Sequence, residues 1–190
     1  MLYFAYGSNL LTERLAARCP TARPAAPATL AGHAVRFAKY SWIDGSGKAT
    51  IRAEADARTQ GLLFEISAAD QDALDRIEGA GKGYDRWDGL TVETAQGTAL
   101  ATTYIASDPR EALVPFDWYL ALILAGAAQH GLAETHAQIA GTAWEVDPQP
   151  DRPGRQAAIA ALRAAGHDDW PGLLDRHGSS DGFDVAMQKP

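Results

Sequence analysis

Segments with the pattern of β-strands outnumber helical segments along the first two thirds of this chain, and that balance limits the fold. Short apolar runs are separated by turns, and the last two runs form a hairpin around Gln96-Gly97. Strands and helices do not alternate one by one, as they would in a parallel α/β sheet. We therefore expect an α+β domain whose sheet curls into a barrel. The expected strands cover residues 2–6, 30–38, 49–53, 61–66, 90–94 and 100–105, with a Pro/Ala-rich connector over 20–27.

The character of the chain changes after Pro148. An apolar helix over 115–130 precedes this point, and a Pro/Gly-containing linker follows it. We predict a folded domain over 1–147 and a C-terminal helical and irregular extension over 148–190. The extension would consist of the linker, a short Ala-rich helix over 155–165 and a Gly/Ser/Asp-rich tail from Trp170.

Composition and charge exclude several functions. The net charge of −7 and the absence of Lys/Arg runs disfavour nucleic acid as a partner. Cys19 is the only cysteine, so an intramolecular disulfide is impossible and a reducing compartment is expected. The start of the chain enters an apolar strand without a basic region, and the longest apolar run, 120–128, is far shorter than the roughly 20 residues of a membrane span. We expect a cytoplasmic protein without a membrane partner.

The turn after the first strand is the first candidate site. Gly7-Ser8-Asn9 leads into an expected helix with Leu11 and Leu15 on its buried face and Glu13 and Arg14 exposed. Free main-chain N–H groups at such a turn can hold a small anion, for example a carboxylate. The alternative is that Asn9 only caps the helix and nothing binds there. The Gly-x-Gly-x-x-Gly pattern of dinucleotide sites is absent.

The second candidate is Glu78, at the end of a helix expected over 67–78. Ser67 and Asp70 resemble a capping box and Gly79 stops the helix. Leu74 and Ile77 mark the expected buried face, and Glu78 lies about 40° from Leu74 at its edge. Partial burial makes a carboxylate a better proton carrier near neutral pH, although a glutamate in this place that reaches water remains the alternative. The expected outward residues are Asp72, Asp75 and Arg76.

Other possible sites fail on spacing. Gly45-Ser46-Gly47-Lys48 resembles the end of a phosphate-binding loop, but Trp42 stands at the earlier glycine position and Ala49 replaces the metal-binding Ser or Thr. The five histidines show no metal-ligand spacing, so no metal site is predicted. Cys19 lacks a Cys-x-x-Cys partner and is expected to be a buried thiol.

The N-terminal segment Tyr3-Phe4-Ala5-Tyr6-Gly7-Ser8-Asn9-Leu10 resembles the signature of the γ-glutamylcyclotransferase / AIG2-like family. Further features fall in that family's order over roughly residues 1–135. They are Ala49-Thr50-Ile51, Gly61 to Ile66, Leu74-Asp75, Glu78-Gly79, Tyr84, Tyr104, Tyr119 and Gly131-Leu132.

This resemblance implies a small closed or nearly closed mixed β-barrel with flanking helices and a cavity for a γ-glutamyl group. Such enzymes release 5-oxoproline by attack of the substrate's α-amine on its own γ-carbonyl, without a cofactor or metal. Glu78 matches the catalytic glutamate. The main chain from Gly7 to Leu10 would hold the α-carboxylate or polarise the γ-carbonyl. Substrate-binding residues implied in this way are Tyr6, Gly7, Ser8, Asn9, Leu10, Tyr84, Tyr104 and Tyr119.

Two departures leave alternatives open. The sequence contains Tyr-Gly-Ser-Asn-Leu rather than the Tyr-Gly-Ser-Leu of the glutathione-degrading branch, so glutathione is a less favoured substrate. The extension after Pro148 has no counterpart in compact family members. The expected substrate is a γ-glutamyl amino acid or amine, bound by a monomer or a homodimer. The alternatives are removal of a γ-glutamyl protecting group from a biosynthetic intermediate, and a binding module without turnover.

Overall fold

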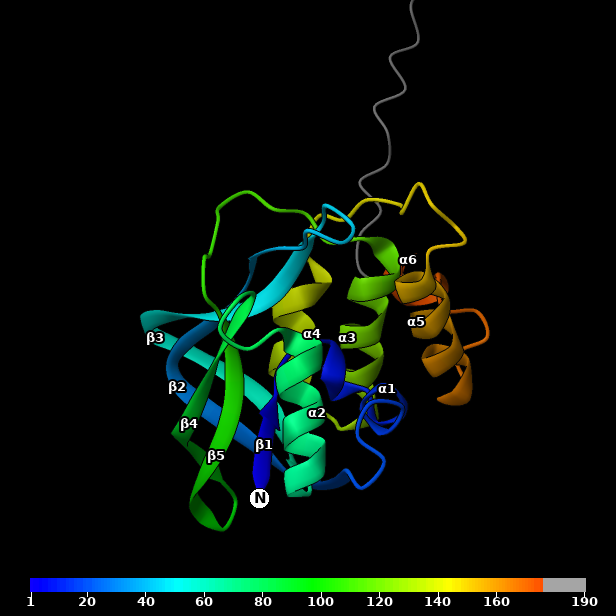
Figure 1. Cartoon of the computed structure of the whole chain (residues 1–190). Helices are drawn as coiled ribbons and strands as arrows, with labels where there is room; N and C mark the ends of the chain where they lie inside the picture. Colours follow the sequence, from blue (N-terminus) through cyan, green and yellow to red (C-terminus); the bar gives the residue numbers. More distant parts are fainter. Residues whose placement is uncertain (176–190) are drawn as a thin grey trace, which may run out of the picture.

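Five strands form a closed barrel in the computed structural model, which describes residues 1–175 (Figure 1). Around the barrel the order is β1-β3-β2-β4-β5. β1 and β5 close the barrel as a parallel pair at Tyr3 and Thr102, and every other pair is antiparallel. The prediction of a mixed barrel in an α+β fold is therefore confirmed. The strands are β1 (Leu2–Ala5), β2 (Arg23–Tyr40), β3 (Gly47–Glu65), β4 (Tyr84–Thr94) and β5 (Gly97–Ala106).

The two longest strands correct the sequence prediction. β2 includes most of the expected connector, because near Pro24 and Pro27 it pairs with β3 and leaves its other edge free, where a proline's missing N–H is tolerated. β3 is continuous where two separate strands were expected. Residues 54–57 contain Glu54, Asp56 and no large apolar side chain. They lie at an irregularity in β3, where the pairing jumps from His33–Ala53 to Ala31–Arg58, so the apolar pattern that predicts a strand is lost there.

The helices cover the barrel on one side in Figure 1. α3 is buried along almost its whole length, because the segment 8–10 and the helices α4, α5 and α6 pack around it. A β-carbon on Gly126 of α3 would lie 2.5 Å from the main-chain nitrogen of Leu11, so only glycine lets α3 support this turn so closely. The helices are the 3₁₀ segment η1 (Ser8–Leu10), α1 (Thr12–Ala16), α2 (Ala68–Glu78), α3 (Asp117–Gln129), α4 (Ala133–Ala140), α5 (Pro153–Ala164) and α6 (Gly172–Asp175).

α2 forms as its sequence predicts. The Asp70 N–H donates to the Ser67 hydroxyl oxygen at 3.1 Å, which caps the start of the helix. Gly79 ends it in the left-handed conformation with φ of 64°. Leu74 is fully buried, but Ile77 is 46% exposed, so the prediction that Ile77 faces the core is wrong. The buried stripe of α2 is narrower than the sequence suggests.

α5, which lies in the predicted extension, packs on helices that cover the barrel. α5 contacts α1 and α3, and it contributes Ala158 and Leu162 to the hydrophobic core. This packing accompanies the burial of Arg14 of α1, which was expected to be exposed and is only 8% exposed. The predicted tail begins at Trp170, which is buried, and its part beyond residue 175 lies outside the described residues. None of the helices in the described range 1–175 is long and apolar enough to cross a membrane.

Candidate active site

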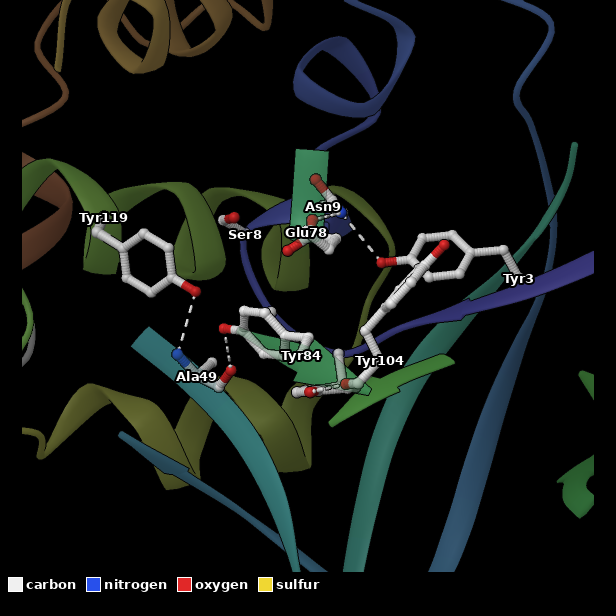
Figure 2. Close-up of a pocket in the computed structure, with 10 residues that line it drawn as sticks. Tyr3, Ser8, Asn9, Ala49, Glu78, Tyr84, Tyr104 and Tyr119 are labelled. Atoms are coloured by element: carbon white, nitrogen blue, oxygen red, sulfur yellow. Dashed lines mark hydrogen bonds between the residues drawn. The ribbon is translucent and has the colours of Figure 1, made fainter. Parts of the chain in front are cut away.

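A hollow opens where β1 ends, at the turn formed by residues 7–10, and the last residue of α2 reaches it (Figure 2). Its empty volume is about 320 Å³, including the opening to solvent. Eight of the nine residues predicted for the site line this hollow. We call it the Glu78 pocket; it is lined by Tyr3, Tyr6, Gly7, Ser8, Asn9, Ala49, Glu78, Tyr84, Tyr104 and Tyr119.

Asn9 connects the turn to the carboxylate. Its Nδ2 donates to the Glu78 Oε1 at 3.3 Å and to the Tyr3 hydroxyl at 3.0 Å, and in Figure 2 the side chains of Asn9 and Glu78 lie together. Its Oδ1 accepts from Arg18 at 3.0 Å. No side chain caps η1 or α1, so the alternative that Asn9 is a helix cap is wrong. The asparagine orients the groups around it.

Glu78 is held at the pocket by the end of α2. Its side chain is 17% exposed, which agrees with the position at the edge of the buried stripe predicted from Leu74. Arg18 lies 3.3 Å from the same Oε1 and is 23% exposed. Both charges stay in contact with solvent, so the ion pair avoids the large desolvation cost of a fully buried pair. The carboxylate is fixed by two donors and remains within reach of a ligand.

Two tyrosines hold the opposite wall. The Tyr119 hydroxyl accepts from the Ala49 N–H at 3.1 Å, and the Tyr84 hydroxyl donates to the Ala49 carbonyl at 2.9 Å. Both main-chain groups of Ala49, its N–H and its carbonyl, are therefore hydrogen-bonded to tyrosine hydroxyls. Ala49 Cβ would lie 3.3 Å from a β-carbon placed on Gly7, so a larger residue at position 7 would narrow the pocket.

The hydroxyl groups of Tyr6 and Tyr104 form hydrogen bonds to the surrounding strands and helix. The Tyr6 hydroxyl donates to the Tyr104 carbonyl oxygen, and the Tyr104 hydroxyl donates to Asp75 at 2.7 Å. Gln71 donates to the same hydroxyl at 2.5 Å. Asp75 also pairs with Arg86 at 2.7 Å, so it is tied to β4 and β5 and is not simply a solvated residue of α2.

The pocket tyrosines remain neutral phenols at physiological pH. Burial raises the pKa of each hydroxyl above its ordinary value. Nearby negative charge adds to this effect, from Glu78 at Tyr3 and from Asp75 at Tyr104. These side chains can donate and accept hydrogen bonds without adding charge, which leaves Glu78 as the ionisable group in the lining. The tyrosines concerned are Tyr3, Tyr6, Tyr84, Tyr104 and Tyr119.

Leu10 is the predicted site residue that does not line the pocket. Its side chain is fully buried, and its N–H donates to the Gly7 carbonyl at 2.9 Å, which closes the turn. Sequence reasoning missed Tyr3, which was quoted only within the N-terminal motif, and Arg18. Tyr3 lies on β1 within the motif, which was a usable signal, but Arg18 reaches Glu78 only through the tertiary fold.

The other sequence candidates lie elsewhere. The Lys48 ammonium donates to Asp44 at 2.7 Å and to Ser46 at 2.8 Å, so its own loop takes up this charge. Cys19 is fully buried as predicted, and burial raises the pKa of its thiol to about 11. Within residues 1–175, no three or more His, Cys, Asp or Glu side chains are grouped so that they could hold a metal ion.

Known proteins are similar to this chain in sequence and in fold. The model of the AIG2-like family matches residues 58–139. The γ-glutamylcyclotransferases of Bos taurus and Homo sapiens are 32% and 31% identical over 135 residues, which is 69% of this chain and 72% of each relative. A solved structure of a γ-glutamyl cyclotransferase superposes with a TM-score of 0.75 at 26% identity, covering 84% of this chain and 98% of its own.

The agreement extends from sequence to architecture, since the relatives match over more than two thirds of their length and the solved structure has the same barrel. The chain therefore belongs to the γ-glutamylcyclotransferase family of AIG2-like enzymes.

Proposed function

We propose that this protein releases 5-oxoproline from a γ-glutamyl amino acid or γ-glutamyl amine, with Glu78 as general acid and base. The observation that carries the proposal is the position of the Glu78 carboxylate. It lines the pocket beside the Gly7–Asn9 turn and receives hydrogen bonds from Asn9 and Arg18, both at 3.3 Å. It is the acidic residue of the pocket lining, and the other residues there are tyrosines and the small residues Gly7, Ser8, Asn9 and Ala49.

The reaction moves two protons from the attacking nitrogen to the leaving nitrogen. Glu78 takes one proton from the substrate's α-ammonium, and the free amine then attacks the γ-carbonyl carbon. A new C–N bond closes the five-membered ring, and the bond to the leaving nitrogen breaks. Glu78 gives the first proton to the leaving nitrogen as the bond breaks. The second proton passes from the ring nitrogen to the leaving amine, which departs as an ammonium ion. A positioned acid and base of this kind contributes about 10²- to 10⁴-fold to the rate.

The remaining pocket residues orient the substrate. The main chain at Gly7, Ser8 and Asn9 offers polar groups for the α-carboxylate or the γ-carbonyl oxygen. The rings of Tyr84 and Tyr119 bound the space for the glutamyl methylene groups. Because the attack is intramolecular, holding the glutamyl chain in a folded rotamer lowers the barrier by removing rotational freedom.

We further propose that the protein acts in the cytoplasm on a small-molecule substrate and needs no nucleic acid or membrane. The acidic net charge of −7 and the single buried cysteine support this environment. The substrate-binding roles of Tyr6, Tyr104 and Leu10 are part of the same proposal, with Leu10 acting through the turn that it closes.

Incubation with a panel of γ-glutamyl amino acids and amines in ¹⁸O-labelled water tests the reaction. We expect 5-oxoproline and the free amine in equal amounts, with no ¹⁸O in the 5-oxoproline, because the ring closes without attack by water. Labelled glutamate in place of 5-oxoproline would show hydrolysis and contradict cyclisation. Absence of any product from the whole panel would favour a binding module without turnover.

A further inference from the structure

The two oxygens of the Glu78 carboxylate have different surroundings. Oε1 accepts a hydrogen bond from the Asn9 Nδ2 and another from the Arg18 Nη1, both at 3.3 Å. Among residues 1–175, no group donates a hydrogen bond to Oε2. Figure 2 shows one oxygen of Glu78 beside the Asn9 amide and the other directed away from it. The carboxylate therefore presents one oxygen that is bonded to the protein and one that is not.

Arg18 connects the two residues that carry the site. The same nitrogen that contacts Glu78 also donates to the Asn9 Oδ1 at 3.0 Å, so the guanidinium meets both the turn and the carboxylate. Arg18 itself does not line the Glu78 pocket. Its effect on a substrate in the hollow therefore passes through Glu78 and Asn9.

The segment that carries Arg18 is fixed against α2. Cys19 is fully buried, and its thiol donates to the main-chain oxygen of Asp70 at 3.7 Å. The Thr21 N–H donates to the Asp70 carboxylate at 3.1 Å. The segment is thus bonded to α2 near the start of the helix, at Asp70, and at its last residue, Glu78. Such a support holds the guanidinium in place, as a residue that orients another one requires.

Hydrogen bonds to one oxygen suit a carboxylate that has to gain and lose a proton. With the proton on Oε2, Oε1 becomes the carbonyl oxygen of the acid and still accepts from both donors. Neither Asn9 nor Arg18 has to move during the transfer, so the site needs no reorganisation at that moment. A proton on Oε1 would instead compete with these two hydrogen bonds.

We propose that Arg18 is a positioning residue of the reaction. Together with Asn9 it holds Oε1 of Glu78, and Oε2 takes the proton from the substrate's α-ammonium and gives it to the leaving nitrogen. This inference rests on the proposed cyclotransferase function, and it names the oxygen that carries the proton and the residue that orients it. Glu78 is neutral between the two transfers, whereas Arg18 keeps its charge throughout.

Steady-state release of 5-oxoproline by Arg18→Gln tests this role. We expect kcat to fall about tenfold or more, the scale of one lost charge-assisted hydrogen bond, with a smaller change in KM. Arg18→Lys, which keeps the charge, should retain part of the wild-type kcat. Arg58→Gln removes an equal charge by breaking the exposed ion pair with Glu93, and it should behave as the wild type.

Two further measurements separate positioning from a merely structural effect. In the Glu78→Gln background, Arg18→Gln should lower the residual rate by less than about twofold, because its effect passes through the carboxylate. A crystal structure of the wild type with 5-oxoproline should place the ring nitrogen at Oε2 and leave Arg18 bonded to Oε1.

Three results would overturn the inference. They are an unchanged kcat in Arg18→Gln, an equal loss of rate in the two backgrounds, and a ring nitrogen bonded to Oε1. If Arg18→Gln does not fold, Arg18→Lys takes its place in the comparison of the two backgrounds, and an equal loss contradicts the inference there as well. A wild type that releases no 5-oxoproline contradicts the proposed function and this inference with it. An active wild type with an equally active Arg18→Gln contradicts the inference alone.

Discussion

The Asn9 amide nitrogen lies 3.3 Å from the Glu78 Oε1, so a residue of the N-terminal turn orients a carboxylate that is 69 positions away in the chain. The contact joins the two features that the sequence singles out separately. It also explains why the Asn9 side chain does not cap a helix: its amide is engaged by Tyr3, Glu78 and Arg18. The turn at residues 7–10 and Glu78 are therefore joined by a direct hydrogen bond.

Replacing Asn9 by Ala should slow catalysis more than it disturbs binding. The change removes the donor that fixes Glu78 and leaves Tyr3 and Arg18 short of a partner, which costs about 1–3 kcal/mol of unfolding free energy. We expect kcat on folded protein to fall about tenfold or more, with a smaller change in KM. Steady-state kinetics beside urea unfolding measures both. Gln138→Ala, which removes a surface hydrogen bond to Arg58, is the control. An unchanged kcat would show that Asn9 is not needed to orient Glu78 for catalysis.

His130 should make stability depend on pH below neutrality. Burial lowers the pKa of its imidazole, which sits at the end of α3 with its Nε2 3.0 Å from the Thr12 hydroxyl oxygen. Between the folded pKa and about 6.5 the unfolded chain binds more protons, so stability rises with pH in that window and the penalty is fully present below it. Urea unfolding between pH 5 and 7 should show this rise in the wild type relative to His130→Gln. Parallel pH profiles for the two proteins would contradict it.

We keep the proposal that residues 1–147 form the catalytic domain and 148–190 an extension, and the packing of α5 makes a prediction about it. Leu162 is fully buried in the core that α5 shares with α1 and α3. Leu162→Ala should lower the free energy of unfolding by about 2–5 kcal/mol. The kcat of the folded protein should stay within about twofold, because α5 contributes no residue to the Glu78 pocket. Arg163→Ala, its exposed neighbour, is the matched control. A large loss of kcat without a loss of stability would assign α5 a catalytic role.

The sequence predicts regular elements well where local signals agree. α2 has a serine cap, a glycine stop and a fully buried Leu74, and these place Glu78 at the edge of the core. The prediction fails where contacts with residues far away in the chain determine the structure. The edge of β2 that accepts Pro24 and Pro27 depends on its partners, and Arg14 lies on α1, which packs against α5 more than 130 residues away in the chain. α4 was not predicted: it is only eight residues long, and of its two buried residues one is the polar Thr135.

Some residues of the candidate site could likewise be predicted from the sequence, whereas their contacts could not. Tyr84 and Tyr119 could be placed by their order in the family motif, but their shared bond to the main chain of Ala49 is a tertiary feature.

The release of 5-oxoproline by Glu78→Gln tests the central claim most directly. The amide keeps the shape of the side chain and its place beside Asn9 but cannot carry a proton. With saturating γ-glutamyl amino acid, we expect kcat to fall by about 10²-fold or more, while calorimetry shows that the folded variant still binds the substrate. Glu65→Gln, an exposed change of the same kind at the end of β3, should behave as the wild type. Wild-type rates in Glu78→Gln would contradict the assignment of Glu78 as the acid and base.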